Sequence, residues 1–492
     1  MSTRLRRTAL AVFLVVVIGA IGARMPLALA AVIVVLGLTL VLSLAAGREN
    51  SLAIGFFLVL LAETKFRNRD AGALLSGQID AQIGFELALY SVVVLLTAIN
   101  VVRIPLGRLR PGPNERFLIC YALFAVASFL WSPTPGITAV RGMQQLMLLT
   151  FLFVAIRILG PQRFLRSLTM TLVFSVLICA AFALIFPWAK GPLEFETWHK
   201  IPRFSWFAVH PITAACEAGA AAVLLLSEQL YGFALSKKRI LMQPLRLFYV
   251  PVIAILLATR ARGAILAALA SALLLIIRPR VSSWMAASAA IALFTLVVLV
   301  SVAGFDLANP LFSAVVSEDN PVGEYLLRGQ SMDQFLTLSG RTELWQGAYE
   351  LFLKQPILGH GYVASRSILL GVESWAGEAH NALVESLLDL GLIGTILIWL
   401  PVLRTFSGSL RMIPGRQGMI WPFPVVSAVL IFVLFEGFVT AGFAGFLTYD
   451  PTLLFSSICL FDGLLARPAR HGIQPAISKM PAGIVTMAKE SA

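Results

Sequence analysis

The sequence predicts an all-α, polytopic integral membrane protein. Of its 492 residues, 59% are apolar and only 13% are charged, whereas a soluble domain has roughly 45–50% apolar and about 25% charged residues. The mean hydropathy of +0.87 indicates that the apolar excess is not confined to one segment. These observations exclude a soluble globular enzyme, a disordered chain and a disulfide-stapled secreted module.

The net charge fits the same class. The 38 basic and 25 acidic residues give +13, and basic residues on cytoplasmic loops orient membrane proteins. We therefore expect membrane lipid, and no nucleic acid, as a partner. The four cysteines are dispersed through apolar stretches without a CxxC pair, so they indicate neither a metal nor a redox site.

The N-terminal segment resembles a signal peptide. Basic residues up to Arg7 precede an apolar run over 8–23, and residues 28–30 form a small-residue pattern that a signal peptidase can cleave. A second apolar run over 27–46 follows at once. We therefore expect an uncleaved first helix.

Fourteen apolar stretches qualify as membrane spans, three of them short, and we expect 12–14 helices to cross the bilayer. A crossing helix needs about 20 apolar residues, or fewer when neighbouring helices shield it. The candidates are 8–23, 26–46, 50–62, 85–102, 115–131, 138–156, 167–186, 211–230, 247–259, 263–277, 283–303, 382–402, 420–441 and 450–466.

These spans divide the chain into five parts. N-terminal spans occupy 1–114, a transmembrane core with short external loops 115–303, one large external loop 304–381, C-terminal spans 382–466 and a tail 467–492. Placing the N-terminus in the cytoplasm puts most basic residues on cytoplasmic loops along the whole chain. Both termini are then cytoplasmic, and the large loop lies on the opposite face. A loop of that length is usually functional or a small domain.

Inside the large loop, the pattern predicts a helix that starts after Ser339, a suitable N-cap. An apolar stripe at helical spacing follows, formed by Leu344, Ala348, Leu351 and Phe352. Pro356 and Gly359 then end the helix near Lys354. Arg341 lies in the first turn, where the helix dipole disfavours a cation, which makes sense if Arg341 shares an anion with the exposed N–H groups. A surface arginine paired with Glu343 or Asp333 is the alternative.

Arg260 and Arg262 lie between the two short spans 247–259 and 263–277, on the face with fewer basic residues. They either extend to lipid phosphates or line a recess for a phosphorylated ligand, because the rigid fork of arginine suits a pyrophosphate. No phosphate-binding P-loop, Rossmann fingerprint, zinc spacing or Asp-x-Asp pair occurs. Any phosphate site is therefore expected to consist of arginines, without a metal.

His380 and Asn381 end the large loop. A lone histidine at that depth is more often structural than catalytic, and both interpretations stay open. Ionisable residues inside spans are costly and indicate function by default, but for most of the acids here we favour pairing with Arg141, Arg203, Arg260 or Arg262. These acids are Glu86, Glu217, Glu385, Asp389, Glu436 and Asp462.

The pattern H-N-x9-G-x-x-G-T resembles the signature of the O-antigen ligase superfamily, which also includes O-antigen and exopolysaccharide polymerases. It is formed by His380, Asn381, Gly391, Gly394 and Thr395. The segment 339–361 is similar to the superfamily's SGR…W…P-x-x-G-x-G block in the same loop. The resemblance covers roughly 115–465 and is specific over 339–395.

Weaker blocks support the same resemblance. Arg262-Gly263-Ala264 resembles the superfamily's arginine–glycine motif between short helices, and Trp131-Ser132-Pro133 with Arg141 matches an early block. Arg203 and His210-Pro211 fall where members have an arginine and then a proline-containing helix start. Here His-Pro replaces the commoner Pro-Asn.

The resemblance implies a metal-independent, GT-C-like glycosyltransferase of the bacterial inner membrane that needs no cofactor and works on the periplasmic face. Such enzymes take a glycan from undecaprenyl pyrophosphate and join it to an acceptor hydroxyl. His380 would act as base or orient the acceptor, while arginines hold the pyrophosphate. The implied catalytic residues are His380, Arg341 and Arg262; the implied substrate-binding residues are Arg203, Arg260, His210, Asn381 and Arg141.

The acceptor stays open. A ligase joins the glycan to a lipid A core, which the superfamily name favours, whereas a polymerase joins it to a second lipid-linked repeat unit. A protein acceptor such as a pilin is a further possibility. A flippase or exporter of the lipid-linked sugar is less favoured, because transporters tend to show internal repeats with broken helices and this sequence shows none.

Overall fold

The computed structural model describes eleven stretches of the chain. The spans expected at 8–23, 26–46 and 283–303, most of the large loop and the C-terminal tail lie outside the described residues. The described residues are 48–63, 81–102 with 104, 109–186, 203–206, 209–231, 247–278, 341–373, 376–412, 422–445 and 449–465.

Every regular element in these stretches is a helix, which confirms the all-α class. The helices are α3 (Arg48–Glu63), α5 (Ala81–Val101), α6 (Pro113–Ala127), α7 (Pro135–Ile185), α9 (Pro211–Tyr231), α11 (Tyr249–Ala258), α12 (Arg262–Ile277), α17 (Arg341–Lys354), α18 (Ser365–Leu369), α19 (Ala382–Arg411), α20 (Pro422–Val439) and α21 (Tyr449–Leu465), with short 3-10 turns η2 (Ser128–Leu130) and η6 (Gly442–Ala444).

Each of the eleven spans expected within the described residues coincides with a helical segment. The spans 138–156 and 167–186 both belong to α7, which is interrupted at Gly160 (φ 74, ψ 158) immediately before Pro161. By length and composition α7, α9 and α19 are each able to cross a membrane, and several shorter apolar helices accompany them. The chain is an all-α, polytopic membrane protein.

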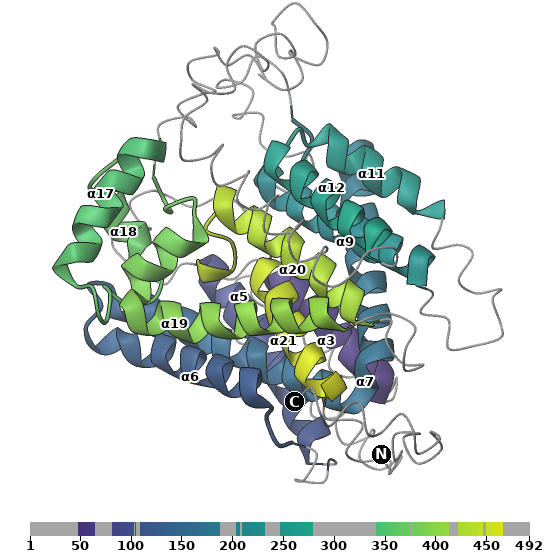
Figure 1. Cartoon of the computed structure of the whole chain (residues 1–492), viewed down its shortest axis with the longest axis horizontal. Helices are drawn as coiled ribbons and strands as arrows, with labels where there is room; N and C mark the ends of the chain where they lie inside the picture. The colour runs from purple at the N-terminus through teal and green to yellow at the C-terminus, as the bar shows by residue number, and fades with distance from the viewer. Residues whose placement is uncertain are drawn as a thin grey trace, which may run out of the picture.

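The helices form one bundle in which α20 is central (Figure 1). α19 runs beside α6, and α20 lies between α19 and the group formed by α9, α11 and α12. α7 packs against α6, α5, α9 and α21. α17 and α18 stand together at the N-terminal end of α19, outside the main bundle. That end therefore carries most of the described part of the large loop.

A second, small core fixes α17 and α18 against the start of α19. It consists of Leu344, Ala348, Leu369, Ala376, Ala379 and Leu388, with Leu351 packed against it. Leu344, Ala348 and Leu351 belong to the apolar stripe predicted from the sequence, and α17 ends at Lys354 as predicted. The expected N-cap Ser339 lies outside the described residues.

The opposite end of α19 is tied to α12 by one arginine. The Nη2 atom of the buried Arg278 donates to the carbonyl oxygens of Leu410 at 2.6 Å and Met412 at 2.9 Å. A cation that satisfies the last carbonyls of a helix also complements the helix dipole. Both ends of α19 are thus fixed, which gives the candidate site a rigid base.

Candidate active site

Two glycine-containing segments, 356–361 and 388–393, join through their backbones at a break in α19. The break is at Gly391 (φ 61, ψ −161). A Cβ on Gly359 would lie 2.5 Å from the Gly391 nitrogen, and a Cβ on Gly391 would lie 2.6 Å from the Gly359 nitrogen. The joining hydrogen bonds run from His360 N to Leu388 O (3.0 Å), Gly361 N to Asp389 O (2.7 Å), Leu392 N to Pro356 O (2.9 Å) and Ile393 N to Ile357 O (3.3 Å). The motif glycines therefore allow the backbone of segment 356–361 to pack directly against α19 at its break.

The buried carboxylates of Glu385 and Asp389 bind the chain that connects α17 to α19. Asp389 accepts from the Val363 and Ser365 amides, both at 2.7 Å. Glu385 accepts from Ser365 Oγ at 2.5 Å and from the Ala379 amide at 2.7 Å. These partners are backbone groups and a serine, and not the four arginines expected from the sequence. A buried carboxylate that accepts several hydrogen bonds offsets its loss of hydration.

Ala379, the residue before His380, is held through both of its backbone polar groups. The Ala379 amide donates to Glu385, and the Ala379 carbonyl accepts from Trp345 Nε1 at 2.8 Å. His380 itself has φ 51, a left-handed conformation that an L-residue adopts only when its surroundings impose it. Trp345 on α17 and Glu385 on α19 thus fix the backbone that carries the imidazole.

Asn381 has a structural role in this conformation. Its side-chain oxygen accepts from the amides of Leu383 at 2.9 Å and Val384 at 3.2 Å, so Asn381 is the N-cap of α19. An N-cap of this kind stabilises a helix by about 1 kcal/mol. The substrate-binding role expected for Asn381 stays a prediction.

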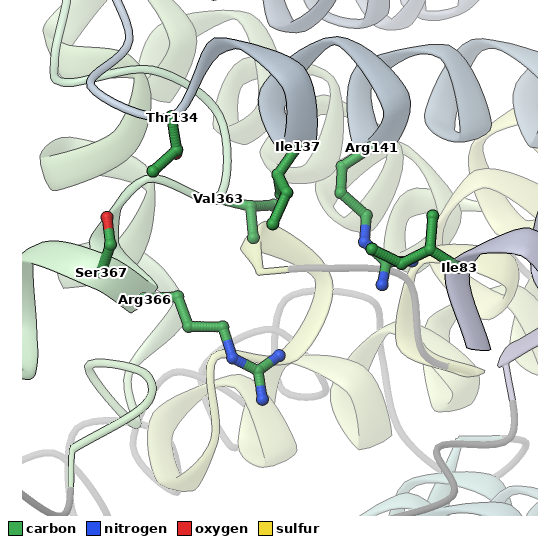
Figure 2. A pocket seen from close by; sticks show the side chains of 7 residues that line it. All are labelled: Ile83, Thr134, Ile137, Arg141, Val363, Arg366 and Ser367. Carbon is green, nitrogen blue, oxygen red and sulfur yellow. The ribbon is translucent and has the colours of Figure 1, made fainter. Parts of the chain in front are cut away.

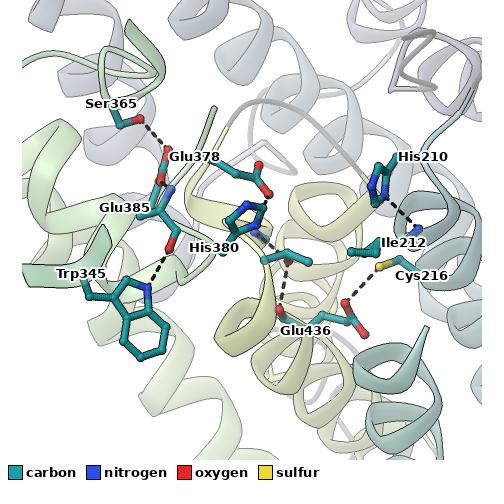
Figure 3. A network of polar contacts seen from close by, with 12 residues as sticks. His210, Ile212, Cys216, Trp345, Ser365, Glu378, His380, Glu385 and Glu436 are labelled. Carbon is teal, nitrogen blue, oxygen red and sulfur yellow. Dashed lines mark hydrogen bonds and ion pairs between the residues drawn. The ribbon is translucent and has the colours of Figure 1, made fainter. Parts of the chain in front are cut away.

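The imidazole of His380 lies against the carboxylate of Glu378 (Figure 3). Nδ1 is 3.0 Å from Glu378 Oε1, and the two side chains are 22% and 23% exposed. They are therefore neither fully solvated nor fully buried.

Arg341, the first residue of α17, shares the surroundings of Glu378. Burial lowers the pKa of the Arg341 guanidinium, and the carboxylates of Glu378 and Glu436 raise it. An arginine remains charged under such opposing influences. Arg341 and His380 are thus brought together around Glu378. Asp333, an alternative partner expected for Arg341, lies outside the described residues.

Glu436 connects this cluster to α9. Its buried carboxylate on α20 accepts from Cys216 Sγ at 3.1 Å (Figure 3). His210 precedes α9, and its Nδ1 accepts from the Ile212 amide at 3.1 Å. His210 therefore caps the start of α9 with one ring nitrogen, and its expected part in substrate binding stays a prediction.

Three of the predicted arginines gather at the turn between α11 and α12. Arg203 Nε donates to the Thr259 carbonyl at 3.0 Å. Arg260 in the same turn has φ 52, and Arg262 is the first residue of α12. All three are half-buried. A turn with three guanidinium groups at a helix N-terminus has the charge and the donors that a pyrophosphate requires.

Arg141 lies apart from that turn. Its Nη1 pairs with the buried carboxylate of Glu86, as the sequence led us to favour for the intramembrane acids, and donates to Gln144 Oε1 at 2.8 Å. Arg141 also lines a small recess beside Arg366, a residue of α18 (Figure 2). Its substrate-binding role stays a prediction.

The hydrogen-bond partners of Asp462 are groups at the start of α6, and not the arginines expected from the sequence. Its carboxylate accepts from the Asn114 amide at 2.8 Å, from Asn114 Nδ2 at 2.9 Å and from the Glu115 amide at 3.0 Å. α21 is thereby joined to the first turn of α6. This contact is structural, and the intramembrane position of Asp462 carries no functional assignment.

Glu378 and Arg366 are the site residues that the sequence did not single out. Glu378 stands two positions before His380, and this proximity was the signal available for it. Arg366 belongs to no motif, and only the fold places it beside Arg141. Within the described residues, no group of three or more His, Cys, Asp or Glu side chains gathers as a metal site requires, and metal independence stays a prediction.

Fold and site together define a polytopic membrane protein with histidine, acids and arginines collected at one end of its bundle. Residues 247–399 match the sequence model of the O-antigen ligase family. This range contains Arg260, Arg262, Arg341 and His380, and the match confirms the superfamily resemblance of the motifs.

A curated relative adds a second finding. The exopolysaccharide production protein ExoQ of Rhizobium meliloti (strain 1021) is 35% identical over 86 residues, which cover 15% of this chain and 20% of the relative. The chain thus matches about a fifth of the length of that relative. The similarity supports the same superfamily, and its short extent leaves the activity of the whole protein to be argued from the site.

Proposed function

We propose that the protein is a membrane glycosyltransferase of the polysaccharide ligase and polymerase type. It takes a glycan from undecaprenyl pyrophosphate and joins it to an acceptor hydroxyl at the periplasmic face of the bacterial inner membrane. The observation that carries the proposal is the placement of His380. Its backbone is fixed by Trp345 and Glu385, its Nδ1 faces Glu378, and its neighbour across that carboxylate is Arg341.

In the proposed reaction, the imidazole of His380 accepts the proton of the acceptor hydroxyl. The acceptor oxygen forms a bond to the anomeric carbon, and the bond from that carbon to the pyrophosphate oxygen breaks. The electron pair leaves with undecaprenyl pyrophosphate, whose charge Arg341, Arg262 and Arg203 stabilise. Direct attack of this kind inverts the anomeric centre. No step needs a metal, since guanidinium groups supply the positive charge.

As acceptor we propose first a lipid A core, which makes the protein an O-antigen ligase. A second candidate is a lipid-linked repeat unit, which makes it a polymerase. The name of the relative, exopolysaccharide production protein, favours this second candidate, since an exopolysaccharide is built by joining repeat units. The two reactions share donor and leaving group and differ in the acceptor alone.

The test uses the purified full-length protein in liposomes with an undecaprenyl-pyrophosphate-linked repeat unit, with and without a lipid A core. Transfer only in the presence of the core identifies a ligase, and a ladder of products from donor alone identifies a polymerase. Donor that crosses the bilayer without any transfer product contradicts the proposal and supports a flippase.

Two variants test the assigned residues in the same assay. His380→Ala should abolish transfer, a loss of about 10²–10⁴-fold for a general base, with the amount of folded protein unchanged. Arg341→Lys keeps the charge but loses the bidentate fork, and we expect a loss of at least about tenfold. Near-normal transfer by His380→Ala would remove the base from the mechanism, and unchanged turnover by Arg341→Lys would argue against pyrophosphate binding there.

A further inference from the structure

The C-terminal end of α17 and the turn after it expose a group of large apolar side chains. The group consists of Tyr349, Leu353, Ile357 and Leu358, which are between 42% and 60% exposed, and we call it the apolar end of α17. Nearer the start of the helix, the exposed side chains are polar, among them Glu343 and Gln346. The exposed surface of α17 therefore changes from polar to apolar along the helix.

The apolar end of α17 is continuous with an exposed apolar stripe on α19. The hydrogen bond from Ile393 N to Ile357 O at 3.3 Å joins the two surfaces directly. From that point the stripe follows α19 at helical spacing. It consists of Leu392, Ile393, Ile396, Leu400 and Leu403, which are between 36% and 57% exposed. Because α19 is long and apolar enough to cross a membrane, this stripe faces acyl chains, and the apolar end of α17 extends the same surface.

The orientation of α17 also suits a membrane surface. α17 lies across the N-terminal end of α19 and not along its axis (Figure 1), so beside a membrane-spanning α19 it runs near the plane of the bilayer. Helices in that position place apolar and aromatic side chains at the boundary between headgroups and acyl chains, with basic residues beside them. Tyr349 packs near Phe352, with ring centroids 6.3 Å apart, and Lys354 stands in the last turn.

The charges of this region are compatible with lipid. Glu350 lies four residues before Lys354 on the helix, so the two opposite charges can share the headgroup layer. The lysine stem can lie along apolar surface while its ammonium group reaches a lipid phosphate. An exposed apolar surface rimmed by such groups is typical of a membrane contact.

We propose that the apolar end of α17 inserts into the bilayer leaflet on the side of the large loop, while the first turn of α17 stays in water. Acyl chains cover Leu353, Ile357 and Leu358, and the headgroup layer takes Tyr349 and Lys354. α17 is fixed to the start of α19 through the small core around Leu344, so the contact sets the height of this end of the protein above the acyl chains. The inference uses the membrane class of the protein and is independent of the proposed reaction.

The experiment measures the surroundings of nitroxide labels by electron paramagnetic resonance. The full-length protein is reconstituted alone in phosphatidylcholine liposomes, after the accessible cysteines Cys120 and Cys179 are replaced by serine. Labels are attached through Leu353→Cys and, in a second variant, Ile357→Cys, so that one perturbed variant does not decide the result. We expect both labels to collide more often with oxygen, which concentrates among acyl chains, than with a water-soluble nickel complex.

Two further labels calibrate the result. Gln346→Cys is the matched control, since Gln346 is an exposed residue earlier on the same helix, and its label should collide mainly with nickel. Ile396→Cys in the stripe of α19 gives the signal of an acyl environment. Nickel access at residues 353 and 357 equal to that at 346, beside a lipid signal at 396, would overturn the inference and indicate a surface for a protein partner. A loss of transfer in any labelled variant concerns the proposed function and leaves this comparison unchanged.

Discussion

Gly391→Ala tests whether the backbone junction between segments 356–361 and 388–393 supports the site. Gly391 has φ 61 and ψ −161, a combination that is essentially restricted to glycine and costs an L-residue about 1–3 kcal/mol. The added Cβ would also lie 2.4 Å from the Ile357 carbonyl oxygen and 2.6 Å from the Gly359 nitrogen. These are backbone atoms, so the substitution can be accommodated only if segment 356–361 moves.

Such a movement has a cost that the structure allows to be worked out. The nearest hydrogen bonds, from Leu392 N to Pro356 O at 2.9 Å and from Ile393 N to Ile357 O at 3.3 Å, contribute about 1 kcal/mol each. Adding the backbone strain gives a destabilisation of about 3–5 kcal/mol. For a chain of this size, that corresponds to a fall in melting temperature on the order of 5 °C.

The assay is thermal unfolding of the detergent-solubilised protein followed by tryptophan fluorescence, together with the transfer assay. We expect a lower melting temperature and a loss of transfer, since the displaced segment leads toward Glu378 and His380. Gly84→Ala is the matched control: Gly84 lies on the exposed face of α5 with open space around its Cβ position, and alanine there should be neutral or stabilise by up to about 1 kcal/mol. If Gly391→Ala melts and transfers like the wild type, the junction does not support the site.

Two other predictions concern buried polar contacts. Glu86→Gln leaves the charge of Arg141 buried without its carboxylate and should destabilise the protein by about 3–5 kcal/mol. The double variant Glu86→Gln with Arg141→Gln should recover most of the melting temperature. Equal melting temperatures of the single and the double variant would refute the pairing. Trp345→Phe removes the hydrogen bond to the Ala379 carbonyl while retaining most of the packing, so transfer should fall several-fold with little change in melting temperature; a wild-type transfer rate would show that this bond does not position His380.

The sequence was sufficient to predict the helices and some of their contacts. Apolar length located each described span, and the stripe containing Leu344 and Ala348 predicted α17 and the face that it buries. The cost of an isolated charge among apolar helices likewise predicted the pairing of Glu86 with Arg141. These features depend on local pattern or on a strong physical penalty, and both can be read along a chain.

The contacts around His380 were not predictable in the same way. Glu385 and Asp389 were expected to pair with arginines because a sequence lists charged side chains and does not reveal which backbone amides a fold leaves unpaired. In the structure, the backbone amides of Val363, Ser365 and Ala379 donate to those carboxylates. Glu378 was overlooked because a carboxylate in a loop is usually solvated, and only the left-handed turn at His380 brings the two side chains together.

The residues of the H-N-x9-G-x-x-G-T pattern have separate structural roles, and these bear on how an acceptor is selected. Asn381 caps α19, and Gly391 leaves room for the backbone of segment 356–361. Thr395 donates to the Gly391 carbonyl at 2.7 Å, which satisfies an acceptor exposed by the break. These residues build the helix start and its interruption, whereas His380 presents its side chain toward the acids and arginines of the site. A framework of this kind positions a base without contacting an acceptor. Under the proposed function, we expect the choice of acceptor to depend on residues outside the pattern, and Arg366, which lines a recess with Arg141, is one to test.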